Sequence, residues 1–580
     1  MRLNRILLVF MSLAIMLSAC KKFGDKLDAL LTNPSVPTPE SADVDLYLNN
    51  LQLNFQGFYQ AASDLSDPLV RQETMFGPLY YNAYGPPSFD GIWGNAYTSI
   101  FKTANTMIPI AESKQEYVHA GIAKVLKAYT MITLVDLFGD VPYSEANQGV
   151  ANTNPKADGG ASIYDSALAL LDSAIADFGV PSLAYPKNDI FYKVSASSTG
   201  NIANWITLAK TIKLKAYVQT RLVDNTVGTK IAALLADGDL ITSASQDFVF
   251  SFSTHNPNPD SRTPHYASNY GTDNGTADYL GNYFMWCLDV EKGMADPRIR
   301  YYIYRQMDDI TGPPASNYQY DYSDPRLKDQ TATQFALACY YRTPPTQYTP
   351  GTPYCIVGEG YWGRDHGNNE GTGPDVKLKS TWGVYPVGGA FDADQNVQVG
   401  PDFEAGAKGN GINPIWLSSF TYFLEAEVAL TITNDATAAE ALMVSGINAS
   451  FSKVANFPTA IGYSLPSAAD TTMMITPTNQ AKYVKKVMSL YEGAASTADK
   501  LNVIMKEYYL AAWGNGLEPY NNYRRTSCPN NFQPAVNPDP GTFIMSFVYP
   551  SVYANYNKNA VQKPDQTVKV FWDTNPDALK

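Results

Sequence analysis

Four histidines are the side chains best suited to acid–base chemistry in this 580-residue chain: His119, His255, His265 and His366. None belongs to an HExxH zinc motif, and the chain contains no P-loop, GxSxG or dinucleotide-binding fingerprint. A glycosidase needs only two carboxylates at a set separation, and a chain with 55 Asp and Glu residues always contains such a pair. The motifs predict a protein that is not an enzyme and that uses no cofactor.

One acidic segment has the alternating oxygen ligands of a calcium loop, at Asp392, Asp394 and Asn396. An EF-hand needs glycine at its sixth position and glutamate at its twelfth, where this chain has Val397 and Phe403. We interpret the segment as a solvated turn and expect no metal site.

Four cysteines follow residue 20: Cys287, Cys339, Cys355 and Cys528. No pair has the CxxC spacing of a structural zinc site or a thioredoxin motif. One or two disulfides can form in an oxidising compartment, and Cys339 and Cys355 are the nearest pair in sequence. The sequence leaves all three full pairings open.

Aromatic residues make up 13% of the chain, with 40 Tyr and 8 Trp. A tyrosine combines an apolar face with a hydroxyl, which suits half-exposed surfaces where ligands dock. Sugars present apolar C–H faces between hydroxyls, so this composition fits a glycan-binding protein. Rings that simply pack between helices would give the same composition.

Exposed aromatic residues in loop-rich segments are the candidate ligand-binding residues, and they form two groups. The first group comprises Tyr80, Tyr81, Tyr84 and Phe89. The second and preferred group comprises Tyr354, Tyr361, Trp362 and Trp382, with Asp365 and Asn368 nearby. Stacked rings leave sugar hydroxyls for neighbouring polar groups to bind. The alternative role for each residue is to anchor its loop. Trp93 is a weaker candidate because Trp93, Tyr97 and Phe101 have the spacing of a helix core.

The N-terminus has the features of an export signal. Arg2 and Arg5 precede an apolar stretch at 6–16, which is shorter than the roughly 20 residues that span a bilayer. Leu17-Ser18-Ala19-Cys20 resembles a bacterial lipobox, so we expect residues 1–19 to be removed and Cys20 to be lipidated. Residues 20–40, rich in proline at their end, are expected to form the lipidated N-terminus and tether.

The formal net charge of −13 disfavours non-specific binding to nucleic acid, which depends on Lys and Arg contacts with phosphates. No later apolar run reaches membrane-spanning length. We therefore expect a soluble body at residues 41–580, held to a membrane only by its lipid.

Apolar residues recur at three- and four-residue steps in several segments, which predicts a mostly α fold with few short strands. The predicted helices are 117–135, 163–178, 201–222, 415–429, 438–451, 481–491 and 501–513. Their pairing suggests tetratricopeptide-like helical hairpins, although no strict 34-residue repeat is present. Residues from about 247 to 400 are instead dense in Pro, Gly, Asn, Asp and Tyr, and predict a loop-rich insert.

Two motifs resemble a known family. The stretch Val135-Asp136-Leu137-Phe138-Gly139-Asp140-Val141-Pro142-Tyr143-Ser144-Glu145-Ala146 resembles the "DxFGDVPYxEA" hallmark of SusD/RagB-type nutrient-binding lipoproteins of Bacteroidota. Residues 516–526 resemble the family's "GxExxxDxRR" region, with Asn522 where the family often has Asp. The closing segments 548–557 and 570–573 also fit, so the resemblance extends over essentially the whole chain.

The resemblance implies a tetratricopeptide-like helical scaffold that covers a SusC-like, TonB-dependent outer-membrane barrel and supplies it with glycans or, in some members, peptides. The motifs also have a structural reading. Gly139 suits a helix C-cap, and Pro142 prevents the helix from resuming. We expect Asp140 or Glu145 to pair with Arg524 or Arg525.

The sequence therefore predicts a surface-exposed lipoprotein that captures an oligosaccharide and delivers it to a partner barrel. A peptide-capturing subunit of the same kind of importer, or a structural protein of the cell envelope, remains the alternative.

Overall fold

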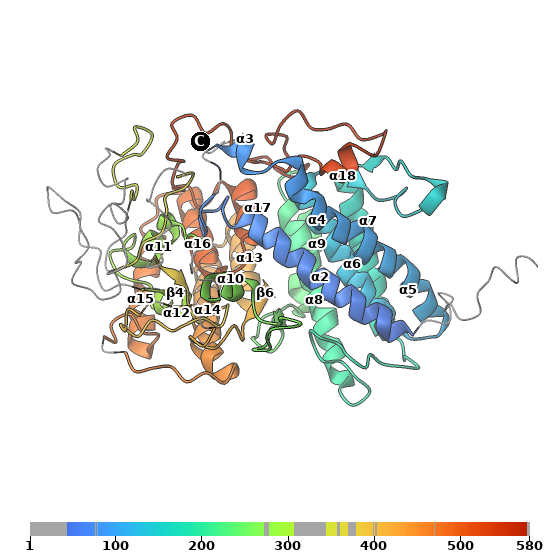
Figure 1. The fold of residues 1–580 in the computed structure, drawn as a ribbon, viewed down its shortest axis with the longest axis horizontal. Coiled ribbons are helices and arrows are strands. Elements are labelled where there is room, and N and C mark those ends of the chain that lie inside the picture. The colour runs from blue at the N-terminus through green and yellow to red at the C-terminus, as the bar shows by residue number, and fades with distance from the viewer. Residues whose placement is uncertain are drawn as a thin grey trace, which may run out of the picture.

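The structure is a computed structural model. It describes residues 43–75, 77, 79–271, 278–306, 344–355, 360–368, 379–397, 399–400, 403–468 and 470–576. Helix α2 (Val44–Ser66) crosses the face of the molecule that is seen in Figure 1. Its buried side chains, such as Leu48, Leu51 and Phe55, recur at three- and four-residue steps, so one face of α2 packs on the core.

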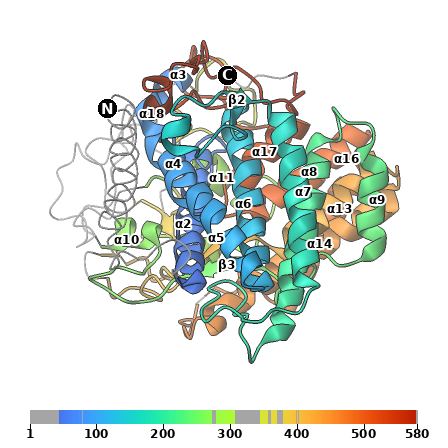
Figure 2. The same ribbon diagram turned by 90° about the vertical axis from the view of Figure 1, so that its right-hand side faces the viewer.

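The first helical region follows α2 in the chain, and its helices lie side by side in Figure 2. It comprises α5 (Lys102–Ser113), α6 (Tyr117–Phe138), α7 (Gly160–Phe178), α8 (Ile202–Thr220) and α9 (Val227–Asp237). Every residue of α6 except Tyr117 and Lys127 is buried, because neighbouring elements cover α6 on all sides. The helices predicted at 117–135, 163–178 and 201–222 are confirmed.

The second helical region comprises α13 (Ser418–Thr431), α14 (Ala436–Ala460), α15 (Pro477–Glu492), α16 (Thr497–Ala511) and α17 (Leu517–Thr526). The predicted helix at 415–429 is correct from Ser418 onward but wrong at its start. Strand β6 (Ile412–Trp416) occupies that position and pairs antiparallel with β3 (Phe248–Ser251). The helix predicted to end at Trp513 ends at Ala511.

The described part of the loop-rich insert contains short elements that pack inward. They are α10 (Pro264–Tyr270), α11 (Asn282–Asp289), α12 (Ile299–Tyr302) and the antiparallel pair β4 (Ile303–Tyr304) and β5 (Thr381–Trp382). Glycine permits one close backbone crossing here, because a Cβ on Gly363 would lie 1.9 Å from the carbonyl oxygen of Leu280. The insert is therefore part of the core where the structure describes it.

Several short elements form one edge of the molecule, where α3 and α18 lie in both ribbon views (Figures 1 and 2). They are α3 (Tyr80–Ala83), η2 (Pro86–Phe89), α4 (Asp90–Gly94), the π-helical η3 (Asn95–Phe101), the pair β1 (Val141–Pro142) and β2 (Ala157–Asp158), η4 (Gly149–Ala151) and α18 (Ser551–Ala554). The helical spacing of Trp93, Tyr97 and Phe101 is confirmed, and Trp93 and Phe101 are buried. A further 3-10 turn, η5 (Thr199–Asn201), precedes α8.

Cys355 is disulfide-bonded, whereas Cys287 and Cys528 are free and buried. Cys339 and Cys20 lie outside the described residues. Among the described helices, none has the length and apolar character needed to cross a membrane.

Candidate ligand-binding site

The motif at 135–146 is built into the core. The carboxylate of Asp136, fully buried in α6, accepts hydrogen bonds from Asn521 Nδ2 at 2.9 Å and Trp572 Nε1 at 3.0 Å, and also from the hydroxyl of Tyr164. Gly139 ends α6 with φ +74° and donates its N–H to the carbonyl of Val135, as its type predicts. Three distant segments are joined through Asp136, so this motif is structural.

The predicted pairing of Asp140 or Glu145 with the two arginines is wrong. Arg525 forks onto the buried carboxylate of Glu427, with Nη2 2.7 Å from Oε2. Asp140 instead accepts from the backbone N–H of Gly160, and Glu145 accepts from Asn152 Nδ2. Both carboxylates lie in the loop that follows α6, and the hydrogen bonds that they accept hold this loop in place.

The expectation that the second aromatic group is exposed is also wrong. Tyr361, Trp362 and Trp382 are all 0% exposed. Trp382 stacks on Trp513 with ring centroids 3.9 Å apart and donates from Nε1 to Glu73 at 3.1 Å. The insert folds back onto α16 and its C-terminal end, so these rings fill the core and present no face to a ligand.

Two polar members of that group are buried beside the rings. Asp365 accepts hydrogen bonds from Asn282 at 3.1 Å, Gln533 at 2.8 Å and the backbone N–H of Cys355 at 2.8 Å. Burial raises the pKa of Asp365, while these donors oppose the shift. Asn368 is buried as well. Both side chains hold the loop together. Tyr354, half-buried, packs its ring edge-on against Tyr348.

The first aromatic group is divided between core and surface. Tyr80 and Phe89 are buried, which corrects the expectation that they are exposed. The hydroxyl of Tyr80 accepts from Arg71 Nη2 at 2.9 Å and lies 3.1 Å from His366 Nε2. Tyr81 is 70% exposed and Tyr84 is half-buried, so these two remain available to a ligand.

Tyr81 and Tyr84 line a hollow of about 420 Å³, which we call the tyrosine groove. Its opposite wall is the C-terminal segment 562–567, with Gln562, Asp565 and Gln566. The amide of Gln566 donates to the carbonyl of Tyr84 at 3.2 Å, which holds the two walls together. This hollow combines tyrosine rings with amide and hydroxyl groups.

A larger hollow of about 620 Å³, which we call the C-terminal groove, is lined in part by residues of the C-terminal stretch 552–557. Trp93 is its central ring, with Tyr97 at 4.8 Å and Tyr553 at 4.9 Å between centroids. Tyr556 stands on the rim and is 82% exposed. The volume is within the range of about 300–1,000 Å³ that is usual for ligand pockets.

Amide side chains complete the C-terminal groove. Asn147, Gln148 and Asn152 line it from the loop between β1 and β2, and Lys102 contributes a charge. The hydroxyl of Tyr97 donates to the carbonyl of Pro142 at 2.6 Å, and Asn147 Nδ2 donates to the carbonyl of Tyr97 at 3.2 Å. These bonds fix the ring and the loop relative to each other.

The C-terminal groove was missed by the sequence analysis. Trp93 and Tyr97 were assigned to the helix core, which is correct for most of their surface, but their edges also line the groove. The sequence did contain one indication, the close spacing of Tyr549, Tyr553 and Tyr556 on either side of Pro550. Nothing in sequence, however, indicates that residues 93 and 553 lie together.

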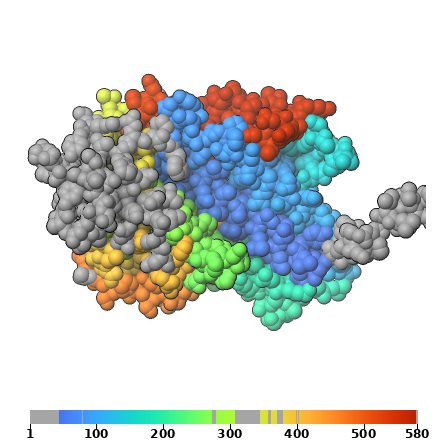
Figure 3. Space-filling view, in the orientation of Figure 1, coloured from blue at the N-terminus to red at the C-terminus, as the bar shows by residue number. Residues whose placement is uncertain are grey.

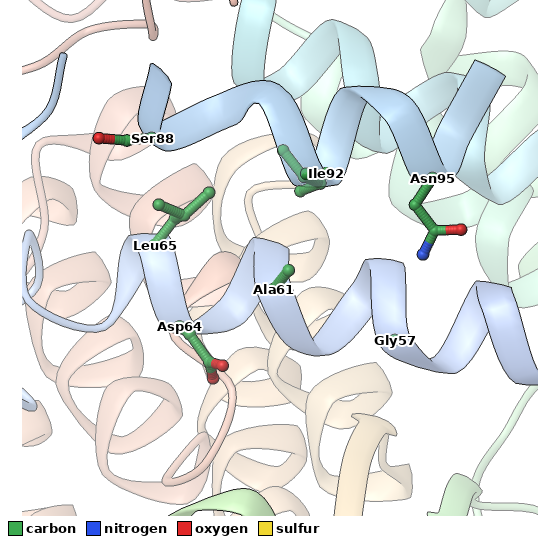
Figure 4. A pocket seen from close by; sticks show the side chains of 8 residues that line it. Gly57, Ala61, Asp64, Leu65, Ser88, Ile92 and Asn95 are labelled. Carbon is green, nitrogen blue, oxygen red and sulfur yellow. The ribbon is translucent and has the colours of Figure 1, made fainter. Parts of the chain in front are cut away.

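A third hollow, of about 450 Å³, lies between α2 and the η2–α4 segment (Figure 4). Gly57, Ala61 and Leu65 form one side, and Ile92 and Asn95 face them. None of its lining residues is aromatic, so a sugar has no ring to stack on there.

A cluster of acidic residues surrounds His265. Its Nδ1 lies 3.0 Å from Asp278 Oδ2 and 3.6 Å from Glu73 Oε1, and its Nε2 lies 3.4 Å from Asp64 Oδ1. Burial lowers the pKa of His265, but hydrogen bonds to Asp278 and Asp64, together with the charges of Glu73 and Asp64, raise that pKa well above its ordinary value. Burial, and then the neighbouring carboxylates, raise the pKa of Glu73 well above its ordinary value.

The segment at 392–396 is not a solvated turn. Asp392, fully buried, pairs with Arg305 at 2.6 Å, and Asp394 pairs with Arg300 at 2.8 Å. The carboxylates are thus already neutralised by arginines. The prediction of a solvated turn is wrong because α12 and β4 bring these arginines against it.

Comparison with known sequences identifies the family. A profile described as "Starch-binding associating with outer membrane" matches residues 44–346, which is more than half of the chain. A second, described as "Susd and RagB outer membrane lipoprotein", matches residues 405–572. The chain belongs to the SusD-like family, as its two motifs suggested. No curated protein matches it.

Solved structures have the same fold. A chitin-binding protein is 20% identical, with a TM-score of 0.62 over 92% of this chain and 100% of its own. A SusD/RagB family protein from Bacteroides thetaiotaomicron is 19% identical, with a TM-score of 0.61 over 92% and 99%. A chitin-binding SusD homologue from Flavobacterium johnsoniae is 17% identical, with a TM-score of 0.58 over 92% and 99%. The predicted mostly α fold is confirmed.

Proposed function

We propose that this protein is a lipid-anchored binding protein that captures an oligosaccharide without altering it and delivers it to a SusC-like, TonB-dependent outer-membrane barrel. The family description names starch, and two structural neighbours are described as chitin-binding. The observation that carries the proposal is the C-terminal groove, where an exposed ring adjoins a cluster of aromatic and amide side chains.

The chemistry of the groove suits a sugar better than an ion or a purely apolar ligand. The ring face of Tyr556 can cover the C–H face of a pyranose while the edge of Tyr97 contacts it, and Asn147, Gln148 and Asn152 can bond to its hydroxyls. The tyrosine groove, with Tyr81 and Tyr84, provides a second contact on the same edge of the molecule. An extended oligosaccharide would therefore bind along this edge.

The binding test is isothermal calorimetry of the full chain against oligosaccharides of the starch and chitin types and against a peptide pool. We expect saturable binding of one oligosaccharide class. Tyr556→Ala should weaken it by a factor of about 5 to 10, since one ring contact contributes about 1 kcal/mol. Leu46→Ala is the matched control, because Leu46 is 67% exposed on α2 and lines neither groove. Binding of peptides alone, or none by any oligosaccharide, would refute the proposal.

The anchor and the partner need separate tests. Cys20→Ala should move the protein from the membrane fraction to the soluble fraction, and continued membrane retention would refute lipid anchoring through Cys20. For the partner, co-purification of a TonB-dependent barrel with the lipidated chain is the expected result.

A further inference from the structure

The end of α2 meets α10 at the cluster around His265, which lies apart from the grooves. Three ligand atoms, one each from Asp64, Asp67 and His265, lie within 4.8 Å of one another. The surface of the α10 segment lies against that of α2 in Figure 3, and Asp64 also lines the α2–α4 hollow (Figure 4). The side chain of Asp64 is 40% exposed, so solvent reaches this cluster.

The Nδ1 nitrogen of the His265 ring is held in place by its neighbours. Its Nδ1 lies 3.0 Å from Asp278 Oδ2, and Asn269 Nδ2 donates to the same oxygen at 2.7 Å. Trp382 stacks on the imidazole with centroids 4.3 Å apart, which fixes the plane of the ring. A histidine that binds a metal through one nitrogen generally donates its other N–H to a carboxylate. His265 has this arrangement, and its Nε2 is directed at Asp64.

Asp67 supplies the second observation. It is 1% exposed, and its Oδ1 accepts no hydrogen bond from any described residue. To its other oxygen, among the described side chains, only the hydroxyl of Ser63 donates, at 3.4 Å. A buried carboxylate with an unmatched oxygen is destabilising unless a proton or a cation compensates it. Glu73 and Asp278 add further negative charge nearby.

We propose that Asp64, Asp67 and Nε2 of His265 bind a divalent transition-metal ion, with Zn²⁺ the best match to one imidazole and two carboxylates. Tetrahedral Zn²⁺ with bonds of about 2.0–2.2 Å sets its ligand atoms about 3.4 Å apart. Nε2 of His265 and Oδ1 of Asp64 already have a separation of 3.4 Å. The farthest ligand atom needs to move by at most about 1.4 Å, and water completes the coordination.

The bound ion would join the C-terminal end of α2 to the loop-rich insert. Gln60 Nε2 donates to Asp64 Oδ1 at 2.7 Å, so one ligand is positioned from within α2. On the side of the loop-rich insert, Asp278 and Asn269 position His265. Binding would therefore stabilise the contact between two segments that are about 200 residues apart in the chain.

The test is calorimetric titration of the purified, tag-free full chain with ZnCl₂ after treatment with a chelator. We expect one site per chain, accompanied by a change in tryptophan fluorescence because Trp382 stacks on His265. Ca²⁺ and Mg²⁺, which prefer all-oxygen ligands, should bind at least tenfold more weakly. The absence of saturable Zn²⁺ binding up to about 1 mM would overturn the proposal.

Asp67→Asn is the decisive variant. Asparagine has the size and shape of Asp67, and Oδ1 of Asp67 accepts no hydrogen bond from any described residue, so the amide should be accommodated and the fold kept. We expect at least a tenfold loss of Zn²⁺ affinity with an unchanged circular dichroism spectrum. Asp172→Asn makes the same chemical change on the exposed side of α7, where Asp172 pairs with Lys213, and should bind Zn²⁺ normally. Undiminished binding by Asp67→Asn would place the ion elsewhere.

Discussion

The buried rings of the loop-rich insert and the exposed rings at the α3–α18 edge have similar sequence surroundings but opposite roles. Trp362 and Trp382 are each followed by Gly in a segment without helical periodicity, yet both are fully buried. Tyr81 and Tyr556 lie among Gly, Pro and Asn and are 70% and 82% exposed. The absence of helical periodicity around an aromatic residue therefore does not predict that its side chain is exposed. A loop can still be buried in the core, because glycine allows two backbone segments to cross closely.

The largest effect that this comparison predicts is on stability. Trp382→Ala should lower the free energy of unfolding by about 3–5 kcal/mol, because it removes a ring stacked between Trp513 and His265 and leaves a cavity. Denaturant unfolding followed by circular dichroism measures it. A loss below about 1 kcal/mol would mean that this ring is not part of the core.

A smaller effect separates two adjacent tyrosines. Tyr80→Phe removes the hydroxyl that accepts from buried Arg71 and should destabilise the protein by about 1–3 kcal/mol, since the donor is left unmatched. Tyr81→Phe is the matched control and should change the unfolding free energy by less than about 0.5 kcal/mol. Equal effects of the two substitutions would contradict their division between core and surface.

Acidification should destabilise the buried region around Tyr80 through its buried neighbour His366. Burial, and then the charge of Arg71, hold the pKa of His366 well below its ordinary value. Below about pH 6.5 the unfolded chain binds a proton that the folded chain excludes, so stability falls as pH falls, by at most about 1.4 kcal/mol per pH unit. His366→Gln should remove this contribution, as unfolding at pH 7.5 and 5.5 would show. An unchanged pH dependence would contradict the burial of a neutral imidazole.

The smallest stability effect is expected at the surface. Tyr81→Ala should alter the unfolding free energy by less than about 0.5 kcal/mol, because its ring is 70% exposed, and under the proposed function it should weaken oligosaccharide binding. Parallel melting and calorimetry of the variant measure both quantities. A large loss of stability would assign Tyr81 to the fold instead.

Periodicity and the two family motifs were enough to predict the helical scaffold. In α6, α7 and α8 the apolar residues recur at helical spacing within each segment, and the structure buries them. The start of α13 was misplaced because pairing with β3, about 160 residues earlier, decides the backbone at 412–416. The candidate site was predicted in part: Tyr81 and Tyr84 lie in a groove, whereas the C-terminal groove joins α4 and η3 to α18 across more than 400 residues. This proximity depends on tertiary packing, which cannot be predicted from the sequence of any single segment.

The position of a bound sugar tests the central claim most directly. A crystal structure of the protein with its tightest-binding oligosaccharide should show a pyranose ring against Tyr556 and Tyr97, with hydroxyls bonded to Asn147 or Asn152 in the C-terminal groove. A sugar bound at a site that contacts neither groove would contradict the account.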